Sequence, residues 1–284
     1  VFIDTLRHDH LSLYGYSRKT TPNLDEWAKK AAVYTQARSI APWTLPSART
    51  MVTGQVPERW SLVPTIQSVL AKQGWNTSFL AGNIYLSSNF DMSTDWTNHR
   101  CINWPLAEVQ INRAQQILSD SSDRDLFMML HIMDMHLPYT EPRPYRFTFA
   151  GERPDVFSSD AFGRSEVIKK AKKLGDEGKQ HVIDRYDNNM YYIDDVLQPF
   201  LDGLPEDSTV FIFSDHGEEF WDHDGFEHGH TLYDELLRIP FLVKSPAIPP
   251  GVYDQPVSLL DLAPTTAAIA SIPFEGASGW DLST

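Results

Sequence analysis

An acid and a histidine stand side by side at the end of a short apolar run late in the chain. The run spans residues 209–213, and Asp215 and His216 follow it closely. Aromatic and β-branched residues between polar segments predict a buried strand, and ligands of α/β proteins bind at the carboxyl ends of such strands. An adjacent Asp and His supply half of a divalent-metal site. The pair alone fits equally well a loop in which Asp215 caps a helix and His216 is solvated.

Four more polar residues follow predicted strands or strand-to-helix turns, namely Asp4, Thr44, Asn83 and His136. If the strands run parallel, their carboxyl ends meet at one edge of a sheet and bring these side chains to Asp215 and His216. This shared placement is the main physical argument, from the residues alone, for a catalytic site.

Thr44 lies just before a helix that we expect to begin at Pro46 or Ser47. A helix N-terminus presents free N–H groups and the positive end of the helix dipole, which suit an anion. The same residues also fit an ordinary capped helix in which Thr44 is a passive turn residue.

Strand-like runs alternate with segments of helical periodicity along nearly the whole chain. We expect strands at 1–3, 33–37, 75–81, 126–130, 209–213 and 239–243. We expect helices at 22–32, 65–73, 107–119, 182–201 and 232–238, and a last one that ends at 269. This order predicts an α/β fold, a three-layer sandwich with a mostly parallel central sheet flanked by helices. Residues 89–105 are expected to be irregular, and residues 140–180 to form a flap or insertion.

The composition limits the classes of partner and of compartment. The chain has 284 residues and a net charge of −14, which excludes non-specific nucleic-acid binding. A single cysteine, Cys101, excludes an intramolecular disulfide. We see no membrane-spanning or targeting segment. The chain opens inside an apolar strand without an initiator Met, so we expect a trimmed N-terminus, and localisation stays open.

Four motifs, taken in order, resemble the sulfatase-like branch of the alkaline phosphatase superfamily. They are an opening motif at 4–11 with 14–16 and 20–25, a nucleophile motif at 43–47 closing at 53–54, a second metal-binding motif at 214–218 with 228–229, 232–235 and 238–240, and a late helix motif at 261–265. The resemblance implies that residues 1–284 form one catalytic domain, trimmed at both ends. The family's smaller C-terminal subdomain is expected to be absent or cut short after Trp280.

The resemblance also implies a metal site. Asp4, Asp215 and His216 would bind one divalent ion (Mn, Mg, Ca or Zn), and the Thr44 hydroxyl would be a further ligand and the nucleophile. Metal coordination lowers the pKa of such a hydroxyl and so supplies an alkoxide near neutral pH.

Further residues would meet the anionic ester substrate. His136 and His228 match histidines that contact the transferred or leaving group and, in some members, help to hold a second metal. We also expect substrate contacts from Arg49, Asn83 and His230. Asn83 fits a loop cap as well, and Arg49 stands one position after the family's arginine, about 100° round a helix. The other histidines are interpreted as surface or supporting residues, namely His8, His10, His99, His181 and His223.

Three departures from the family pattern shape the predicted function. Thr44 stands where true sulfatases carry the Cys or Ser that matures to formylglycine, so no formylglycine is expected. Thr5 replaces a second metal-binding Asp, which favours one metal over two, and Gly229 replaces a Lys found in many sulfatases. The sequence therefore predicts a metal-dependent hydrolase of phosphate or sulfate esters with Thr44 as nucleophile. The alternatives are a phosphoglycerol- or phosphoethanolamine-type transferase and a non-catalytic binding relative with a degenerate site.

Overall fold

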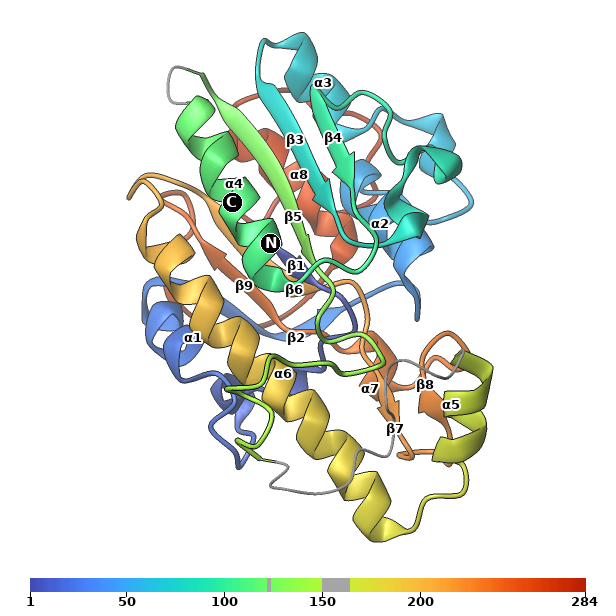
Figure 1. Cartoon of the computed structure of the whole chain (residues 1–284). Helices are drawn as coiled ribbons and strands as arrows, with labels where there is room; N and C mark the ends of the chain where they lie inside the picture. Colours follow the sequence, from blue (N-terminus) through green and yellow to red (C-terminus); the bar gives the residue numbers. More distant parts are fainter. Residues whose placement is uncertain (122–123, 150–163) are drawn as a thin grey trace.

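The computed structural model describes residues 1–121, 124–149 and 164–284, and its centre is an eight-stranded sheet (Figure 1). The strands are β1 (Phe2–Ile3), β2 (Ala32–Arg38), β3 (Asn76–Ala81), β4 (Asn98–Cys101), β5 (Leu126–Ile132), β6 (Val210–Ser214), β9 (Phe241–Lys244) and β10 (Gly251–Ser258). Their order is β10-β2-β9-β6-β1-β5-β3-β4. Only β9 pairs antiparallel with its neighbours, which confirms the mostly parallel sheet.

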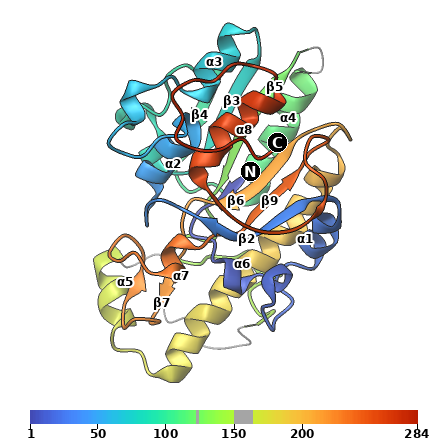
Figure 2. The same cartoon turned by 180° about the vertical axis from the view of Figure 1, so that it is seen from behind.

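Helices cover both faces of this sheet and give the predicted three layers (Figures 1 and 2). One face carries α1 (Pro22–Trp27), α4 (Ala107–Asp120) and α6 (Asp176–Asp202), and the other carries α2 (Thr44–Thr53), α3 (Ile66–Lys72) and α8 (Leu262–Ile269). Each face has its own buried apolar cluster, which is what a sheet apolar on both sides requires. No helix in the described ranges is both long and apolar enough to cross a membrane.

The remaining elements are short. A two-stranded hairpin of β7 (Glu219–Phe220) and β8 (Phe226–Glu227) lies with α5 (Arg164–Ala171) and α7 (Asp234–Leu237) at the lower right of Figure 1. Short 3-10 helices lie at η1 (His8–His10), η2 (Ser12–Tyr14), η3 (Ala28–Lys30), η4 (Trp60–Leu62), η5 (Ile84–Leu86), η6 (Ser88–Phe90) and η7 (Leu259–Asp261).

The register of the central strands fixes where the polar residues lie. Phe2 of β1 pairs with His131 of β5 and with Phe213 of β6, both in parallel. Because the three strands end together, Asp4 and Asp215 emerge at the same edge of the sheet.

Several elements differ from the prediction. Strand β4 lies inside the stretch expected to be irregular, and β10 was not predicted. Both are edge strands, where polar residues and Pro256 are tolerated because one side needs no hydrogen-bonding partner. Helix α2 begins at Thr44 itself. Of the flap expected at 140–180, residues 150–163 lie outside the described ranges, while α5 and the start of α6 lie in the rest.

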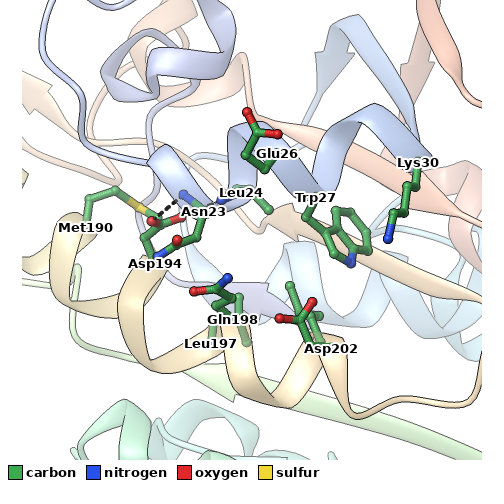
Figure 3. A pocket seen from close by; sticks show the side chains of 11 residues that line it. Asn23, Leu24, Glu26, Trp27, Lys30, Met190, Asp194, Leu197, Gln198 and Asp202 are labelled. Carbon is green, nitrogen blue, oxygen red and sulfur yellow. Dashed lines mark hydrogen bonds between the residues drawn. The ribbon is translucent and has the colours of Figure 1, made fainter.

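Helices α1 and α6 enclose a pocket of about 220 Å³ on one face (Figure 3). At its wall, the buried carboxylate of Asp194 accepts hydrogen bonds from the backbone N–H groups of Asn23 (2.9 Å) and Leu24 (2.8 Å). These are orphan donors of the first turn of α1, so Asp194 caps that helix from a distance. Asp194 therefore has a structural role, and none of the predicted site residues lines this pocket.

Candidate active site

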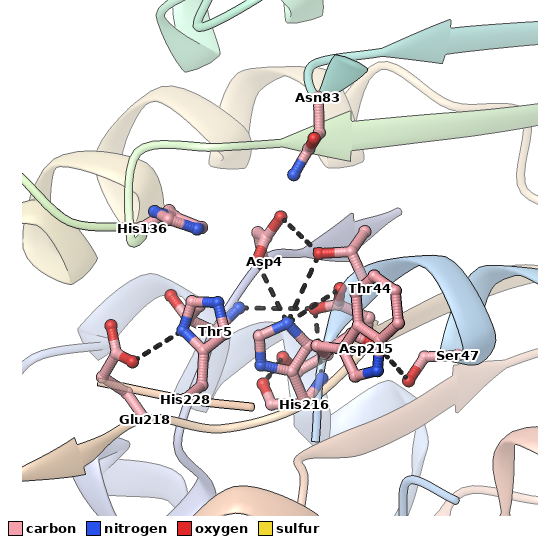
Figure 4. Close-up of polar contacts among 12 residues, drawn as sticks. Asp4, Thr5, Thr44, Ser47, Asn83, His136, Asp215, His216, Glu218 and His228 are labelled. Atoms are coloured by element: carbon pink, nitrogen blue, oxygen red, sulfur yellow. Dashed lines mark hydrogen bonds and ion pairs between the residues drawn. The ribbon is translucent and has the colours of Figure 1, made fainter. Parts of the chain in front are cut away.

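The candidate site lies at the carboxyl edge of the sheet, where four buried side chains converge (Figure 4). Asp4 follows β1, Asp215 and His216 follow β6, and Thr44 opens α2. The Thr44 Oγ1 atom lies 3.4 Å from both Asp4 Oδ2 and His216 Nε2. His216 Nε2 lies 3.5 Å from Asp4 Oδ1 and 3.3 Å from Asp215 Oδ2. The prediction that these residues share one edge is thus met by the geometry.

The oxygen and nitrogen atoms that meet in this cluster are suitable ligands for a divalent cation. Asp4 Oδ1 and Asp215 Oδ2 are buried and accept no hydrogen bond from the residues that the structure describes. His216 Nδ1–H donates to the Gly217 carbonyl (2.9 Å), so Nε2 carries a lone pair and faces both carboxylates. Three acceptor atoms, one each from Asp4, Asp215 and His216, therefore meet within 4.8 Å of one another. Hydrogen-bond acceptors that lie this close together, with no donor between them, repel one another, and a bound metal ion would stabilise them.

Hydrogen bonds from the backbone and from one further histidine fix the carboxylates. Asp215 Oδ1 accepts the N–H groups of Thr5 (3.3 Å) and His216 (3.1 Å). Asp4 Oδ2 accepts from His131 Nε2 (3.1 Å), because His131 Nδ1 accepts the Gly82 N–H (3.1 Å) and the ring proton is therefore on Nε2. His131 was not among the predicted site residues. The sequence contained a signal for this role, because His131 is the one polar residue of the apolar strand β5.

The electrostatics of the cluster follow from burial and from the short distances between charges. Burial alone would raise the pKa of Asp4, but the hydrogen bond from His131 and the nearby imidazoles hold it below its usual range. Burial and the charge of Asp4 raise the pKa of Asp215 well above its usual range, and burial lowers that of His216. A bound cation would favour the ionised forms of both carboxyl groups and so oppose the rise in the pKa of Asp215.

Two more predicted residues, His136 and His228, face this cluster. The His228 Nδ1–H donates to Glu218 Oε1 (2.8 Å), and the hydroxyl of Tyr139 donates to Glu218 Oε2 (2.9 Å). His136 Nδ1–H donates to the Leu137 carbonyl (2.9 Å). The ring of His228 lies 4.9 Å from that of His136, between centroids. Both histidines therefore keep Nε2 free for proton transfer.

Glu218 and Tyr139 were given no role in the prediction. Burial raises the pKa of Glu218 to about 7, and its two hydrogen bonds hold it beside His228. A carboxyl group that accepts from Nδ1–H fixes both the tautomer and the orientation of an imidazole. Glu218 is thus a positioning residue for His228.

The three predicted substrate contacts have different outcomes. Asn83 Oδ1 accepts from the Tyr85 N–H (3.0 Å) and caps η5, while its amide NH₂ group points toward Asp4 and Thr44 (Figure 4). The Arg49 guanidinium donates to the Phe90 carbonyl (3.1 Å) and lies 4.0 Å above the Trp60 ring. Its contact with substrate stays a prediction.

His230 Nε2 lies 2.7 Å from Glu219 Oε2, so that carboxylate holds the ring. Its contact with substrate also stays a prediction. In the described ranges, no lysine or arginine side chain forms a hydrogen bond or an ion pair with Asp4, Thr44, Asp215 or His216.

Arg7 ties the start of the chain to the loop after His216. Its buried guanidinium donates to the Glu218 carbonyl (3.1 Å), to Asp222 (2.7 Å) and to Asp9 (2.7 Å). Burial would raise the pKa values of Asp9 and Asp222, but Arg7 holds both below their usual range. Such carboxylates stabilise the fold above their unfolded pKa of about 4, and this stabilisation is lost as the pH falls through their lower folded pKa values.

We therefore expect Arg7→Met to lower the free energy of unfolding by about 1–3 kcal/mol at pH 7 and by clearly less at pH 3. Urea unfolding of the metal-free protein at both pH values measures the difference. Arg38→Met is the control, because Arg38 pairs with a carboxylate, Asp234, that is 64% exposed. An equal loss at both pH values would contradict the role given to Asp9 and Asp222.

Comparison with known proteins finds relatives of this chain among sulfatases and phosphoethanolamine transferases. The family model described as Sulfatase matches residues 1–272. The uncharacterized sulfatase YidJ of Escherichia coli (strain K12) is 29% identical over 57% of this chain and 35% of its own length. Phosphoethanolamine transferase EptC of Escherichia coli O18:K1:H7 is 25% identical over 96% of this chain and 50% of its own length. The chain thus spans half or less of these two relatives.

A solved structure shares the fold. The C-terminal periplasmic domain of EptC from Escherichia coli, in complex with Zn, superposes with a TM-score of 0.75 at 19% identity and covers 98% of this chain and 82% of that domain. At this identity the likeness shows the common fold.

Proposed function

This chain belongs to the sulfatase family, and from that premise we propose that it cleaves phosphate esters with the Thr44 hydroxyl as the nucleophile. The observation that carries the proposal is the position of Thr44. Its Oγ1 lies at the N-terminus of α2, within 3.4 Å of both Asp4 and His216. Asp4, Thr44, Asp215 and His216 are the residues that would hold the metal, and zinc is the first ion to test because the similar EptC domain holds it.

The reaction would run in two transfers. In the first, Thr44 Oγ1 attacks phosphorus, a P–O bond to threonine forms, and the P–O bond to the leaving alcohol breaks. A divalent ion held by the four residues would lower the pKa of the hydroxyl and offset charge on the non-bridging oxygens. The free N–H groups of the first turn of α2 and the Asn83 amide lie where they can bind those oxygens. In the second transfer, water or an alcohol displaces Thr44 from phosphorus.

The two histidines are suited to move the protons of these steps. The leaving alcohol takes a proton as it departs, and the incoming water or alcohol gives one up. His136 and His228 each keep Nε2 free and have Nδ1 engaged, so each can exchange a proton at Nε2. Glu218 holds His228 in the tautomer that this exchange needs.

One feature favours phosphate over sulfate esters, and a second favours phosphodiesters over phosphomonoesters. A threonine cannot mature to the formylglycine that the family's sulfatases use, so Thr44 must react as a hydroxyl. The absence of a lysine or arginine partner for the four cluster residues, within the described ranges, also favours a monoanionic phosphodiester over a dianionic monoester.

A second candidate function is transfer to an alcohol, as in the phosphoethanolamine transferases. The match to EptC across 96% of this chain favours it. Hydrolysis and transfer share the first step and differ only in the acceptor. The non-catalytic alternative is less favoured, because Asp4, Thr44, Asp215, His216, His136 and His228 all converge on one place.

Rates on aryl esters test the proposal directly. The zinc-loaded protein is assayed with a p-nitrophenyl phosphodiester, a phosphonate monoester, a phosphomonoester and a sulfate ester. We expect the phosphodiester or phosphonate to react fastest, and mass spectrometry of quenched reactions to find the phosphoryl adduct on the Thr44 peptide. A preference for the sulfate ester, or an adduct elsewhere, would refute it. Added alcohols that divert product from hydrolysis would identify a transferase.

A further inference from the structure

A second group of side chains of the kinds that bind metal ions lies between β7 and α7, outside the Thr44 cluster. It consists of Glu219, His223, His230 and Glu235. One ligand atom from each of Glu219, His223 and Glu235 lies within 4.8 Å of the others. His230 Nε2 lies 2.7 Å from Glu219 Oε2, and His223 Nδ1 lies 2.7 Å from Glu235 Oε1. None of these residues belongs to the Thr44 cluster.

The two carboxylates are buried with little to balance their charge. Glu219 is fully buried, and the Glu235 side chain is 6% exposed. In the described ranges neither pairs with a lysine or arginine, and no hydrogen bond reaches Glu235 Oε2. Among the described residues, the side chains that hydrogen-bond to these two carboxylates are the imidazoles of His223 and His230. A bound cation would compensate two desolvated carboxylates more closely than imidazoles alone.

The loop is built closely around the Glu219 carboxylate. Its Oε1 accepts the backbone N–H groups of His223 (3.0 Å) and Gly225 (2.7 Å). A side chain at position 225 would bring a Cβ within 2.3 Å of Glu219 Oε2, so it would displace this carboxylate. The Oε2 atom is left to His230.

We propose that Glu219, His223, His230 and Glu235 bind a metal ion of zinc type, separate from the ion at Thr44. Two imidazole nitrogens and two carboxylate oxygens are a ligand set that zinc accepts in tetrahedral geometry. Tetrahedral ligands at about 2.0–2.1 Å from zinc lie roughly 3.4 Å apart. Binding would require the 2.7 Å contacts to open and the two histidines to move toward a common ion, and their side chains, 44% and 39% exposed, have room to do so.

An ion at this site would stabilise the loop that carries His228. It would join residues 219–223 to residues 230–235, and His228 lies between these two segments. Helix α7 also supports the loop after His216, since the Gly217 N–H donates to the Leu236 carbonyl (2.8 Å). The ion would therefore have a structural role, and the inference does not depend on the chemistry proposed for Thr44.

Zinc stoichiometry of the metal-stripped chain tests the inference. Calorimetric titration with Zn²⁺, checked by elemental analysis, is expected to give two ions for the wild type and one for the double variant His223→Ala/His230→Ala. Asp215→Asn should also keep one ion, and the three changes together none. The exposed loop acid Asp224→Asn is the matched control and should keep both.

A folding readout separates loss of the site from loss of structure. In the Asp215→Asn background, Zn²⁺ should raise the melting temperature, and His223→Ala/His230→Ala should remove that rise while circular dichroism stays unchanged. A single ion in the wild type, or two ions in the double variant, would overturn the inference. So would a second ion that is lost with His228→Ala and kept in the double variant.

Discussion

Thr44→Ala should abolish turnover while leaving the metal site largely intact. The hydroxyl is the proposed nucleophile, and removing an enzyme's nucleophile typically costs on the order of 10³-fold or more in kcat. The two carboxylates and His216 keep their positions, because Asp4 is held by His131 and Asp215 by backbone N–H groups. Initial rates with the best aryl ester, together with a Zn²⁺ titration of the same preparation, measure both effects.

Thr44→Ser is the matched control for this prediction. It retains the hydroxyl at the start of α2 and should keep a substantial part of the activity, with the phosphoryl adduct now on the serine. If Thr44→Ala retained a rate near that of the wild type, the nucleophile would have to be another group, and the proposed two-step reaction would fail. A loss of zinc binding in Thr44→Ala would show instead that its hydroxyl is a major ligand.

The position of the site could be predicted from the sequence because it depends on strand ends. Asp4, Asn83, His136 and Asp215 each follow a strand of one mostly parallel sheet. Once the strands are recognised as parallel, their polar followers must meet at one edge, whatever the details of packing.

Side-chain partners from distant segments could not be predicted in this way. Arg49 contacts Trp60 and the Phe90 carbonyl, and His230 contacts Glu219. His131 gained its role only through the register that places β5 beside β1. Such contacts depend on which loops lie close together in the fold, and the spacing of residues in the sequence does not show this.

Edge strands were missed for a related reason. The β4 segment, Asn98–Cys101, has no apolar alternation, and β10 contains Pro256. Each forms because a neighbouring strand offers unpaired backbone groups, so the information lies in the sheet and not in the segment.

Asp215→Asn should remove the catalytic metal and the activity together. The change replaces a carboxylate, one of two in the cluster, with a neutral amide that presents a weaker oxygen donor to a cation. The carboxylate oxygen without a hydrogen-bond partner, Oδ2, is the atom whose lone pairs a cation would use. Asp215 would be a direct ligand, so its loss should lower the affinity for Zn²⁺ at this site by more than the roughly 10–100-fold caused by mutating a group that only hydrogen-bonds to a ligand.

The effect should be distinguishable from simple loss of stability. Asp215 is buried beside Asp4, and burial with that neighbouring charge raises its pKa, so its ionised form is disfavoured in the metal-free protein. Removing one charge should leave the metal-free fold as stable as the wild type or more so, while activity in saturating Zn²⁺ disappears. Thermal unfolding in EDTA and rates in excess Zn²⁺ test the two halves. An inactive variant that is also markedly unstable in EDTA would mean that Asp215 holds the loop and not the ion.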